Sequence, residues 1–348
     1  MTVNLNDIKL SPNLESVHRE KMSDEEYFSS KYTNYISNSR LKLINPNQNG
    51  SPSKYKEGFT GETTISLSIG SAIHELLLQK DVFTLGPDIG KPSAKLGLVI
   101  DEIFKLRKKN LPIYIYSAIV EACEKIHYYE VSLTPSRIKS IIKDGFRYYY
   151  NLKLITDNNT IILSSKDRDT VEKCINNLNS NRQVNNLLYP TDIFGDAIET
   201  YNEEAFFIDI NASYNGNQHT LKLKMKADNW TIDLENKIIT LNDLKTTGHL
   251  LYQFMEPGGS FEIFSYSRQF AYYIWVLLRY CEKKYGYNSE EWTVKCNVIV
   301  VETTSTNSVG VYPINKEVLE QGRKEFCKLL KMVAYCEMNG YSDDIIFV

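Results

Sequence analysis

The sequence of 348 residues lacks the marks of several protein classes. No run approaches the ~20 consecutive apolar residues of a membrane span. The polar start, MTVNLNDIKLSPNLESVHRE, has no apolar signal segment. The six cysteines include no C-x-x-C pair, which argues against a zinc site and favours reduced thiols. We therefore expect a cytoplasmic protein with no membrane partner.

A large excess of charge of either sign is also absent. The formal net charge is −3, which argues against a generally adhesive nucleic-acid binder but allows a local basic channel on an acidic body. Hydrophobic residues make up 42% of the chain and charged residues 24%, a balance typical of a globular protein with room for a large core.

The most informative segment is 224–247, KMKADNWTIDLENKIITLNDLKTT. Side chains at i and i+2 of a strand project from one face, so Asp243 and Lys245 are expected to point into one site. Asp228 is expected to end the preceding strand and to reach this site if the two strands form a hairpin. An exposed hairpin with a salt bridge is the simpler alternative.

An Asp…Asp-x-Lys arrangement is typical of a metal-dependent phosphodiesterase. Two carboxylates, here Asp228 and Asp243, can hold a hard divalent ion through oxygen ligands. Such an ion polarises a phosphate and lowers the pKa of a bound water. Lys245 can orient that water or offset the charge that develops on the phosphate.

The segment 220–228, TLKLKMKAD, has the period-2 alternation of a strand. Its apolar members are Leu221, Leu223 and Met225, and its basic members are Lys222, Lys224 and Lys226. Asp228 has the parity of the lysines, so we expect all four on one face, suited to binding the phosphate backbone of DNA. A solvated lysine face that protects an edge strand from aggregation is the alternative.

Two predicted helices carry further candidates. The run 69–78 has the apolar stripe of a buried helix face and includes His74. This histidine is either a core residue or, beside a metal site, a ligand. The aromatic-rich segment 261–284 is predicted to be a long helix on which Gln269 and Tyr273, four residues apart, share a face.

Four blocks in this order, GSAIHELLL, KMKAD, LNDLKTT and QFAYY, resemble the RecE-like (exonuclease VIII) and RecB-type branch of the PD-(D/E)XK nucleases. The segment from Tyr35 to Ile44, YISNSRLKLI, followed by SPSKY, resembles the entry segment of phage RecE-like exonucleases. The resemblance extends from about Tyr27 to the C-terminal helix, nearly the whole chain.

The resemblance implies a role for each motif residue. His74, Asp228 and Asp243 match metal-binding positions, with His74 a ligand or its close neighbour. Lys245 matches the catalytic lysine. Gln269 and Tyr273 match a Q-x-x-x-Y motif that positions DNA or supports the site.

The chain departs from the family pattern at two points. Ala227 stands where the family has proline, and the second acid is Asp rather than Glu, as is common in this branch. Neither change removes a metal-binding oxygen. An additional upstream acid is expected to join the site, and the sequence leaves Glu199, Glu203 and Glu204 open.

The predicted fold class is α/β, with a PD-(D/E)XK core: a central mixed sheet flanked by helices, plus an N-terminal helical elaboration. Residues 1–26 are predicted to be a polar, disordered N-terminus, and 27–348 one exonuclease domain. Within it, 27–190 is expected to be mainly helical, and 191–348 to hold the catalytic sheet and closing helices. The predicted strands are 205–214, 220–228, 237–245, 293–303 and 309–314.

The sequence therefore predicts a metal-dependent phosphodiester hydrolase, with Mg²⁺ as cofactor and Mn²⁺ as alternative. The resemblance implies an exonuclease that digests linear double-stranded DNA 5′-to-3′ in phage-type recombination. It also implies a ring-shaped homotetramer, action in the host cytoplasm and a RecT-type single-strand annealing partner. An endonuclease or a repair or CRISPR-adaptation nuclease on the same fold, and a non-catalytic DNA-binding module, stay open as alternatives.

Overall fold

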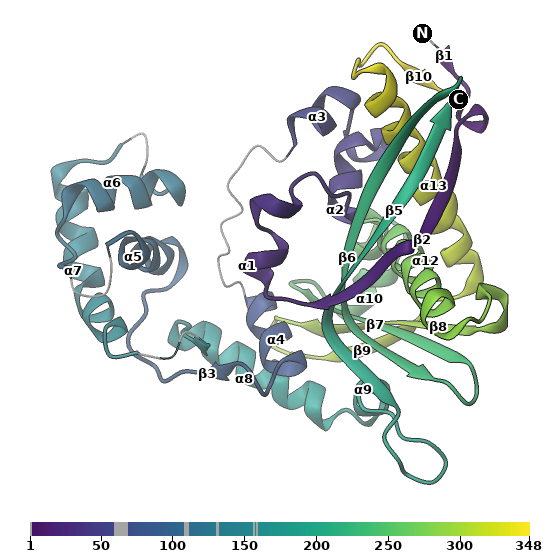
Figure 1. Cartoon of the computed structure of the whole chain (residues 1–348). Coiled ribbons are helices and arrows are strands. Elements are labelled where there is room, and N and C mark those ends of the chain that lie inside the picture. Colours follow the sequence, from purple (N-terminus) through teal and green to yellow (C-terminus); the bar gives the residue numbers. More distant parts are fainter. Residues whose placement is uncertain (1, 59–68, 108–110, 130–131, 156, 158) are drawn as a thin grey trace. The chain divides into compact units, whose positions relative to one another are not determined.

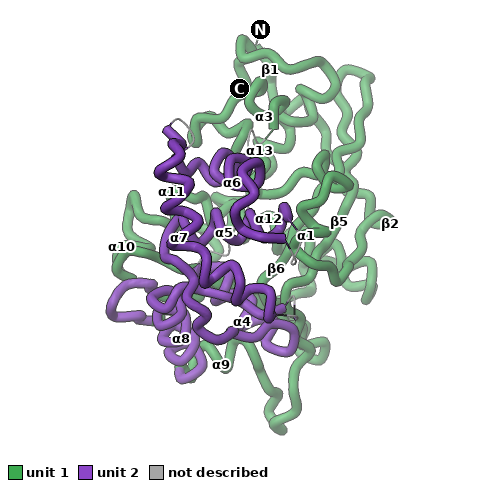
Figure 2. The backbone as a smooth tube through the Cα atoms, turned by 90° about the vertical axis from the view of Figure 1, so that its left-hand side faces the viewer, with its two compact units in different colours: residues 1–60, 181–301, 309–348 green, residues 61–180, 302–308 purple. Residues whose placement is uncertain are grey.

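The structure, a computed structural model, describes residues 2–58, 69–107, 111–129, 132–155, 157 and 159–348. The chain forms two compact units (Figure 1, Figure 2). Unit 1 comprises 1–60, 181–301 and 309–348, and unit 2 comprises 61–180 and 302–308. Two compact units can belong to one folding domain, so the single domain predicted for 27–348 stays a prediction.

Unit 1 is built on a six-stranded sheet with the strand order β2-β5-β6-β7-β8-β9. The strands are β2 (Lys9–Lys21), β5 (Glu199–Tyr214), β6 (Asn217–Asp233), β7 (Ile238–Thr247), β8 (Thr293–Glu302) and β9 (Val309–Pro313). A short parallel pair, β1 (Thr2–Val3) and β10 (Ile346–Phe347), joins the two ends of the chain. The strand β6 continues five residues beyond Asp228, so the prediction that this acid ends its strand is wrong.

The sheet is mixed. The pairs β2–β5, β5–β6, β6–β7 and β8–β9 are antiparallel. The N–H of Thr293, which begins β8, donates to the carbonyl of Lys237, which directly precedes β7. These two strands therefore start side by side and run in the same direction. A parallel pair needs a long crossover, and the chain between β7 and β8 supplies it as α10 (Leu251–Met255), α11 (Ser260–Ile263), α12 (Tyr266–Tyr285) and η5 (Ser289–Glu291).

One face of the sheet is covered by α12 and by α13 (Lys316–Asn339) (Figure 1). The ring of Phe206 on β5 lies 5.2 Å from Tyr280 of α12, and Tyr214 lies 5.2 Å from Tyr335 of α13. The alternating apolar residues of β6 are buried in this core: Leu221, Leu223 and Met225. Each large apolar side chain buried there contributes about 1.5–3 kcal/mol. The predicted α/β fold with helices against a mixed central sheet is confirmed.

The prediction of a disordered N-terminus is wrong for most of its length, because Lys9–Lys21 form β2 at the edge of the sheet. This strand pairs with β5 and has an irregular register between Asn13 and His18. An edge strand can carry many polar side chains, since one of its edges and part of its surface face water. Its partner is about 190 residues away in the sequence, so polarity alone gave no sign of the pairing.

Short helices follow β2 in the chain, and two of their residues contact α12. They are α1 (Asp24–Tyr27), η2 (Ser30–Tyr32), α2 (Asn38–Leu41), η3 (Lys42–Ile44), η4 (Pro46–Gln48) and α3 (Pro52–Glu57). The buried Arg268 of α12 donates hydrogen bonds to Asn38, Gln48 and Glu325 at 2.8–3.1 Å. A buried guanidinium is tolerated only with such partners. The contacts fix the position of α12, and with it the neighbouring Gln269.

The opposite face of the sheet is covered at β5 and β6 by α1 and η2. A small apolar cluster forms there from Met22, Tyr27, Tyr32, Ala205 and Phe207. Lys224 lies within it, only 7% exposed, and its Nζ donates to the carbonyl of Tyr27 at 2.7 Å and lies 4.3 Å from that ring. Burial lowers the pKa of this amine to about 8.

The lowered pKa of Lys224 gives a stability prediction. The unfolded chain, in which the amine has its ordinary pKa of 10.5, holds more protons than the folded chain between pH 8 and 10.5. The free energy of unfolding of the wild type relative to Lys224→Met should therefore increase with pH, by about 1.5 kcal/mol from pH 8 to 9.5. Urea unfolding of both proteins across this range measures the difference. A difference that is constant or falls with pH would contradict the assignment.

Unit 2 is mainly helical over its described residues. Its elements are α4 (Ile69–Leu78), β3 (Thr84–Leu85), α5 (Ala94–Arg107), α6 (Tyr116–Lys125), α7 (Pro135–Leu152), β4 (Thr160–Ile161) and α8 (Ser165–Ser180), while α9 (Arg182–Leu188) belongs to unit 1. An apolar core of its own lies among α5, α6 and α7. Among the described residues of the whole chain, no helix has the length and apolar character needed to cross a membrane.

Candidate metal centre and its lysine

Three carboxylates form one row across the neighbouring strands β5, β6 and β7. The register pairs that flank the row are Asn202–Asn229, Glu204–Ala227 and Asn229–Asn242. This register sets Glu203 opposite Asp228 and Asp228 opposite Asp243. The three acids, which are 25 and 15 positions apart in the sequence, are thus brought to one line of the sheet.

A ladder of asparagine side chains, three of them buried, holds the strands in register directly beside this row. Amide groups donate in sequence from Asn297 to Asn242, from Asn242 to Asn229 and from Asn229 to Asn202, at 2.7–2.9 Å. The ladder spans β5, β6, β7 and β8. Because each donor would lose its partner if one strand slipped, the ladder specifies the register that aligns the acids.

Regular backbone pairing between the strands is interrupted at the row of acids. Glu203 has a left-handed backbone conformation, with φ at 54°, which interrupts regular pairing there. The carboxylate of Asp228 accepts a hydrogen bond from the backbone N–H of Leu244 at 2.8 Å. The N-terminal half of β6 does not pair with β7 along this edge. It pairs with Ile36 instead, whose backbone N–H donates to the carbonyl of Lys222 at 2.7 Å. The acids therefore lie where β7 separates from β6.

Asp243 and Lys245 form a buried ion pair, as their i, i+2 spacing predicts. The carboxylate of Asp243 lies 2.5 Å from Nζ of Lys245 and accepts a hydrogen bond from the side chain of Gln269 at 2.7 Å. Burial by itself lowers the pKa of Lys245, but the carboxylates of Asp243 and Asp228 outweigh burial and raise it above its ordinary value. The lysine is therefore a protonated hydrogen-bond donor at neutral pH.

Two tyrosines of α12 lie close to these residues. Nζ of Lys245 lies 5.1 Å from the ring centre of Tyr266. Burial raises the pKa of the Tyr273 phenol well above its ordinary value, and the nearby Tyr27, Asp243 and Asp228 add to this effect. Tyr273 therefore carries a neutral hydroxyl near Asp243 and Asp228. Gln269 and Tyr273 lie on the same side of α12, as their spacing predicts.

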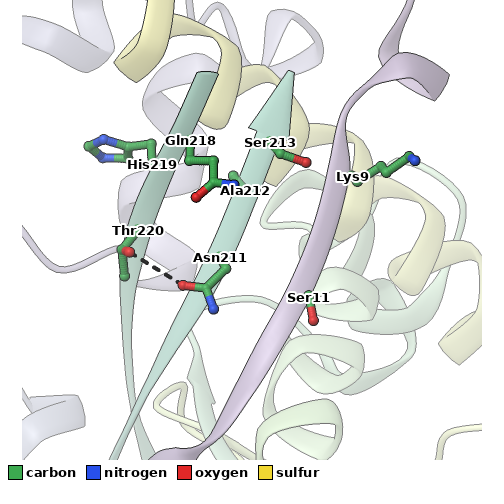
Figure 3. A pocket seen from close by; sticks show the side chains of 8 residues that line it. All are labelled: Lys9, Ser11, Asn211, Ala212, Ser213, Gln218, His219 and Thr220. Carbon is green, nitrogen blue, oxygen red and sulfur yellow. Dashed lines mark hydrogen bonds between the residues drawn. The ribbon is translucent and has the colours of Figure 1, made fainter. Parts of the chain in front are cut away.

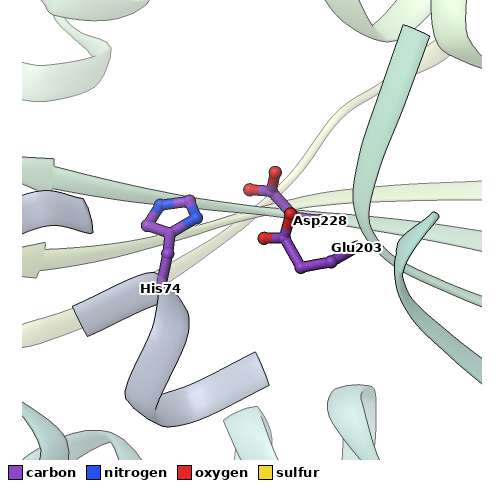
Figure 4. Close-up of side chains that lie close together, drawn as sticks. All are labelled: His74, Glu203 and Asp228. Carbon is purple, nitrogen blue, oxygen red and sulfur yellow. The ribbon is translucent and has the colours of Figure 1, made fainter. Parts of the chain in front are cut away.

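Glu203 and Asp228 form the part of the row that can take a cation. Oxygens of their carboxylates lie within 4.8 Å of one another (Figure 4). Nζ of Lys226 lies 2.9 Å from Glu203 and also pairs with Asp24. Carboxylate oxygens are the ligands that Mg²⁺ and Ca²⁺ prefer, so the donors present fit a hard divalent ion. Figure 4 also draws His74, which α4 of unit 2 carries and which is half-buried.

The register distinguishes the three upstream acids that the sequence left open. Glu203 is the one opposite Asp228, whereas Glu204 pairs with Arg19 at 3.0 Å and Glu199 is exposed and accepts a hydrogen bond from Tyr201. A turn signal could have found Glu203. The dipeptide Asn215-Gly216, with φ of 48° and 82°, joins β5 to β6, and residues equally distant from a two-residue turn face one another.

The predicted lysine face is largely covered. Only Lys222 is exposed, while Lys224 is buried beneath α1 and η2, and Lys226 is held by Asp24 and Glu203. The parity of the strand is as expected, but the 24–32 segment packs over it. Of the three lysines predicted to bind DNA, the structure leaves Lys222 as the one that is open to a phosphate.

A separate polar hollow lies at the far end of β2, β5 and β6 (Figure 3). It has a volume of about 590 Å³ and is lined by Lys9, Ser11, Asn211, Ala212, Ser213, Gln218, His219 and Thr220. Along β6, Thr220 is eight residues from Asp228, roughly 26 Å at the rise of a strand. None of the predicted site residues lines this hollow.

Comparisons with known proteins add little to this geometry. No family model and no curated protein matches the sequence. A putative exonuclease from Eubacterium rectale is similar in structure over 92% of this chain and 88% of its own, with 11% identity and a TM-score of 0.39. Rai1 from Scheffersomyces stipitis, in complex with (3'-NADP)+ and a calcium ion, matches over 95% and 82%, with 12% identity and a TM-score of 0.18. Structural similarity at scores this low carries no functional argument.

Proposed function

We propose that this protein is a metal-dependent deoxyribonuclease. The observation that carries the proposal is the row of Glu203, Asp228 and Asp243, with Lys245 paired to the last of these acids. This arrangement combines oxygen ligands for a divalent ion with a fixed cation beside them. It occurs at an opening of a sheet whose register is locked by buried side chains, which is the rigid support that catalytic geometry requires.

The ligand set proposed for Mg²⁺, with Mn²⁺ as alternative, is Asp228 with Glu203, together with Asp243. His74 is proposed as a further ligand or a close neighbour of the site, on the strength of the family resemblance. When bound, a divalent ion supplies positive charge for phosphate oxygens and lowers the pKa of a coordinated water.

The residues around the ligands have distinct proposed roles. Lys245, a protonated donor, offsets negative charge that develops on the phosphate during hydrolysis. Asp243 fixes the position of Lys245, and Gln269 holds Asp243 from the other side. Tyr273 presents a neutral hydroxyl toward the same acids. The exposed Lys222 is proposed to contact the DNA backbone, where each such contact adds salt-dependent affinity.

The finer proposal is a 5′-to-3′ exonuclease on linear double-stranded DNA, of the RecE-like type within the PD-(D/E)XK nucleases. It rests on the order of the blocks that carry His74, Asp228, Asp243 with Lys245, and Gln269. The same resemblance supports action in phage-type recombination in the host cytoplasm, a ring-shaped homotetramer around DNA and a RecT-type annealing partner.

A direct assay tests both levels of the proposal. Linear duplexes labelled at either 5′ or 3′ ends, and a covalently closed circle, are incubated with the protein and Mg²⁺ or Mn²⁺. Progressive loss from the 5′ end with an intact circle is the expected result. A nicked or linearised circle would replace the exonuclease by an endonuclease. No hydrolysis with either ion would overturn the proposed enzyme and leave a DNA-binding module.

Glu203 gives a prediction with an internal control. Replacing Glu203 by glutamine removes one charged oxygen ligand, so the affinity for Mn²⁺ should fall about tenfold. Glu204→Gln is the matched control, because Glu204 has the same side-chain exposure but pairs with Arg19. It should lower stability and leave the affinity for Mn²⁺ unchanged. Calorimetric titration measures both, and equal affinities in the two variants would remove Glu203 from the ligand set.

A further inference from the structure

An exposed apolar patch lies on the segment that joins β7 to α12, in unit 1. It consists of Leu250, Tyr252, Ile263 and Phe264, which are 42–59% exposed. Their helices, α10 and α11, pack against one another. Single exposed apolar residues are ordinary on protein surfaces, whereas several on one short segment mark an interaction site.

Phe264 connects this patch to the catalytic lysine through one aromatic ring. Nζ of Lys245 lies 5.1 Å from the ring centre of Tyr266, and the rings of Tyr266 and Phe264 are 5.8 Å apart. Neighbouring nucleotides of a stacked strand rise by ~3.4 Å. Phe264 is therefore within about three nucleotide steps of a phosphate held at Lys245.

The backbone holds Phe264 in a fixed position. Ser265 has a left-handed conformation, with φ at 51° and ψ at 47°, which is uncommon for a residue with a side chain. It is kept there because its N–H donates to Glu262 and its carbonyl accepts from Gln269. Strain of this kind persists only where surrounding contacts impose it, and it gathers at functional sites.

An aromatic cluster supports the other side of Tyr266. The ring of Phe254 stacks on Tyr266 at 5.9 Å, and Phe261 lies at 6.0 Å. Both are buried, whereas Phe264 is half exposed. Phe264 is thus the exposed member of an aromatic cluster that extends from the core to Tyr266, the ring over which Nζ of Lys245 lies.

We propose that Phe264 is a stacking platform for a nucleobase of the strand whose phosphate lies at Lys245. The inference rests on the proposed function and adds the element that binds the base. Every base has a π-face, so stacking tolerates any sequence, as a nuclease that degrades DNA without sequence preference requires. A base is the expected occupant because Phe264 and Lys245 share the ring of Tyr266 as a neighbour, and the substrate groups next to a bound phosphate are bases.

The test is DNA binding by Phe264→Ala, measured by fluorescence anisotropy with an end-labelled duplex in Ca²⁺, with the duplex shown to stay intact. Loss of one base–aromatic stack predicts about tenfold weaker binding. Phe264→Trp should bind like the wild type, and Phe264→Leu should bind weakly although it keeps an apolar side chain. Phe146→Ala is the matched control, since Phe146 is similarly exposed (52%) and lies 4.7 Å from Tyr150 in unit 2.

A double-mutant cycle that combines Phe264→Ala with abasic DNA distinguishes loss of stacking from a general disturbance of the site. Each of the three terminal nucleotides is made abasic in turn. At one position the abasic change should weaken binding of the wild type about tenfold and of Phe264→Ala not at all. Binding of Phe264→Ala equal to that of Phe146→Ala would overturn the platform. Effects of the variant and of the abasic change that multiply at every position would overturn it as well.

Binding and hydrolysis are read separately, so the two proposals fail separately. If the abasic cycle shows coupling while the wild type hydrolyses no DNA, the platform stands and the hydrolase falls. If the wild type hydrolyses DNA but the abasic cycle shows no coupling at Phe264, the hydrolase stands and the platform falls. Thermal unfolding of Phe264→Ala, expected to match the wild type because the ring is half exposed, guards against loss of fold.

Discussion

Replacing Lys245 by methionine is expected to reduce Mg²⁺-dependent hydrolysis of linear duplex DNA by about 10²- to 10³-fold. The variant removes the cation that faces the developing phosphate charge, and single donors of this kind have effects of that size. Methionine keeps the length of the side chain. Initial rates of nucleotide release at saturating DNA measure the loss, which should fall on kcat rather than on the affinity for DNA.

The same substitution should also destabilise the fold, because Asp243 is 1% exposed and would keep Gln269 as its polar partner while losing its ion pair. Removing one member of a buried pair costs about 3 kcal/mol or more. The double variant Asp243→Asn/Lys245→Met removes both charges and should recover most of that stability. It should stay inactive. Hydrolysis restored together with stability would mean that Lys245 serves the fold and not the chemistry.

Replacing Asp228 by asparagine is expected to weaken Mn²⁺ binding by at least about 100-fold and to abolish hydrolysis at ordinary Mg²⁺ concentrations. Asp228 is the central acid of the row, so it contributes to the ligand set with either neighbour. An asparagine oxygen can still accept the hydrogen bond from the N–H of Leu244, so the fold should be kept. Calorimetry with Mn²⁺ and hydrolysis across a Mg²⁺ titration measure the two effects.

Asp233→Asn is the control for this experiment. Asp233 lies on the same strand but accepts hydrogen bonds from Asn236 in the turn, outside the row. It should change neither ion affinity nor hydrolysis. If Asp228→Asn retained wild-type affinity for Mn²⁺, the row of acids would not be a metal site.

The Lys245 and Asp228 variants together distinguish the residue that acts in hydrolysis from the residue that binds the ion. Lys245→Met should leave Mn²⁺ bound but hydrolysis lost, whereas Asp228→Asn should lose both. This difference follows from the distances, since carboxylate oxygens of Asp228 and Glu203 lie within 4.8 Å of one another while Lys245 contacts Asp243. Loss of Mn²⁺ binding on removal of Lys245 would contradict this division, because the ion pair with Asp243 would then be needed to hold the ligand set in place.

Local patterns predicted the side chains that a single element orients. The alternation in β6 gave the buried face of Leu223 and Met225, and the i, i+2 spacing gave the ion pair of Asp243 with Lys245. The i, i+4 spacing likewise put Gln269 and Tyr273 on one side of α12. These relations depend on the geometry of one strand or helix, so neighbouring residues suffice to determine them.

The pairing of one strand with another could be predicted from the sequence only in part. The turn at Asn215-Gly216 fixes which residues of β5 and β6 face one another, and so sets Glu203 opposite Asp228. The sequence reveals this only once β5 and β6 are known to form a hairpin through that turn. The strand β2 had no such local signal, since its partner is far away in the sequence. Long-range pairing depends on complementary surfaces that no single segment contains.

The sequence by itself determined the strand and helix periodicities, the face shared by Asp243 and Lys245, and the acids from which a metal site could be built. Only the tertiary structure decided that Glu203 faces Asp228, that α1 and η2 cover Lys224, and that the ring of Tyr266 lies close to both Phe264 and Lys245. The physical reason is the range of the interactions. Backbone geometry repeats over two to four residues, whereas strand register, burial and the approach of a loop to a site arise from packing between segments tens to hundreds of residues apart.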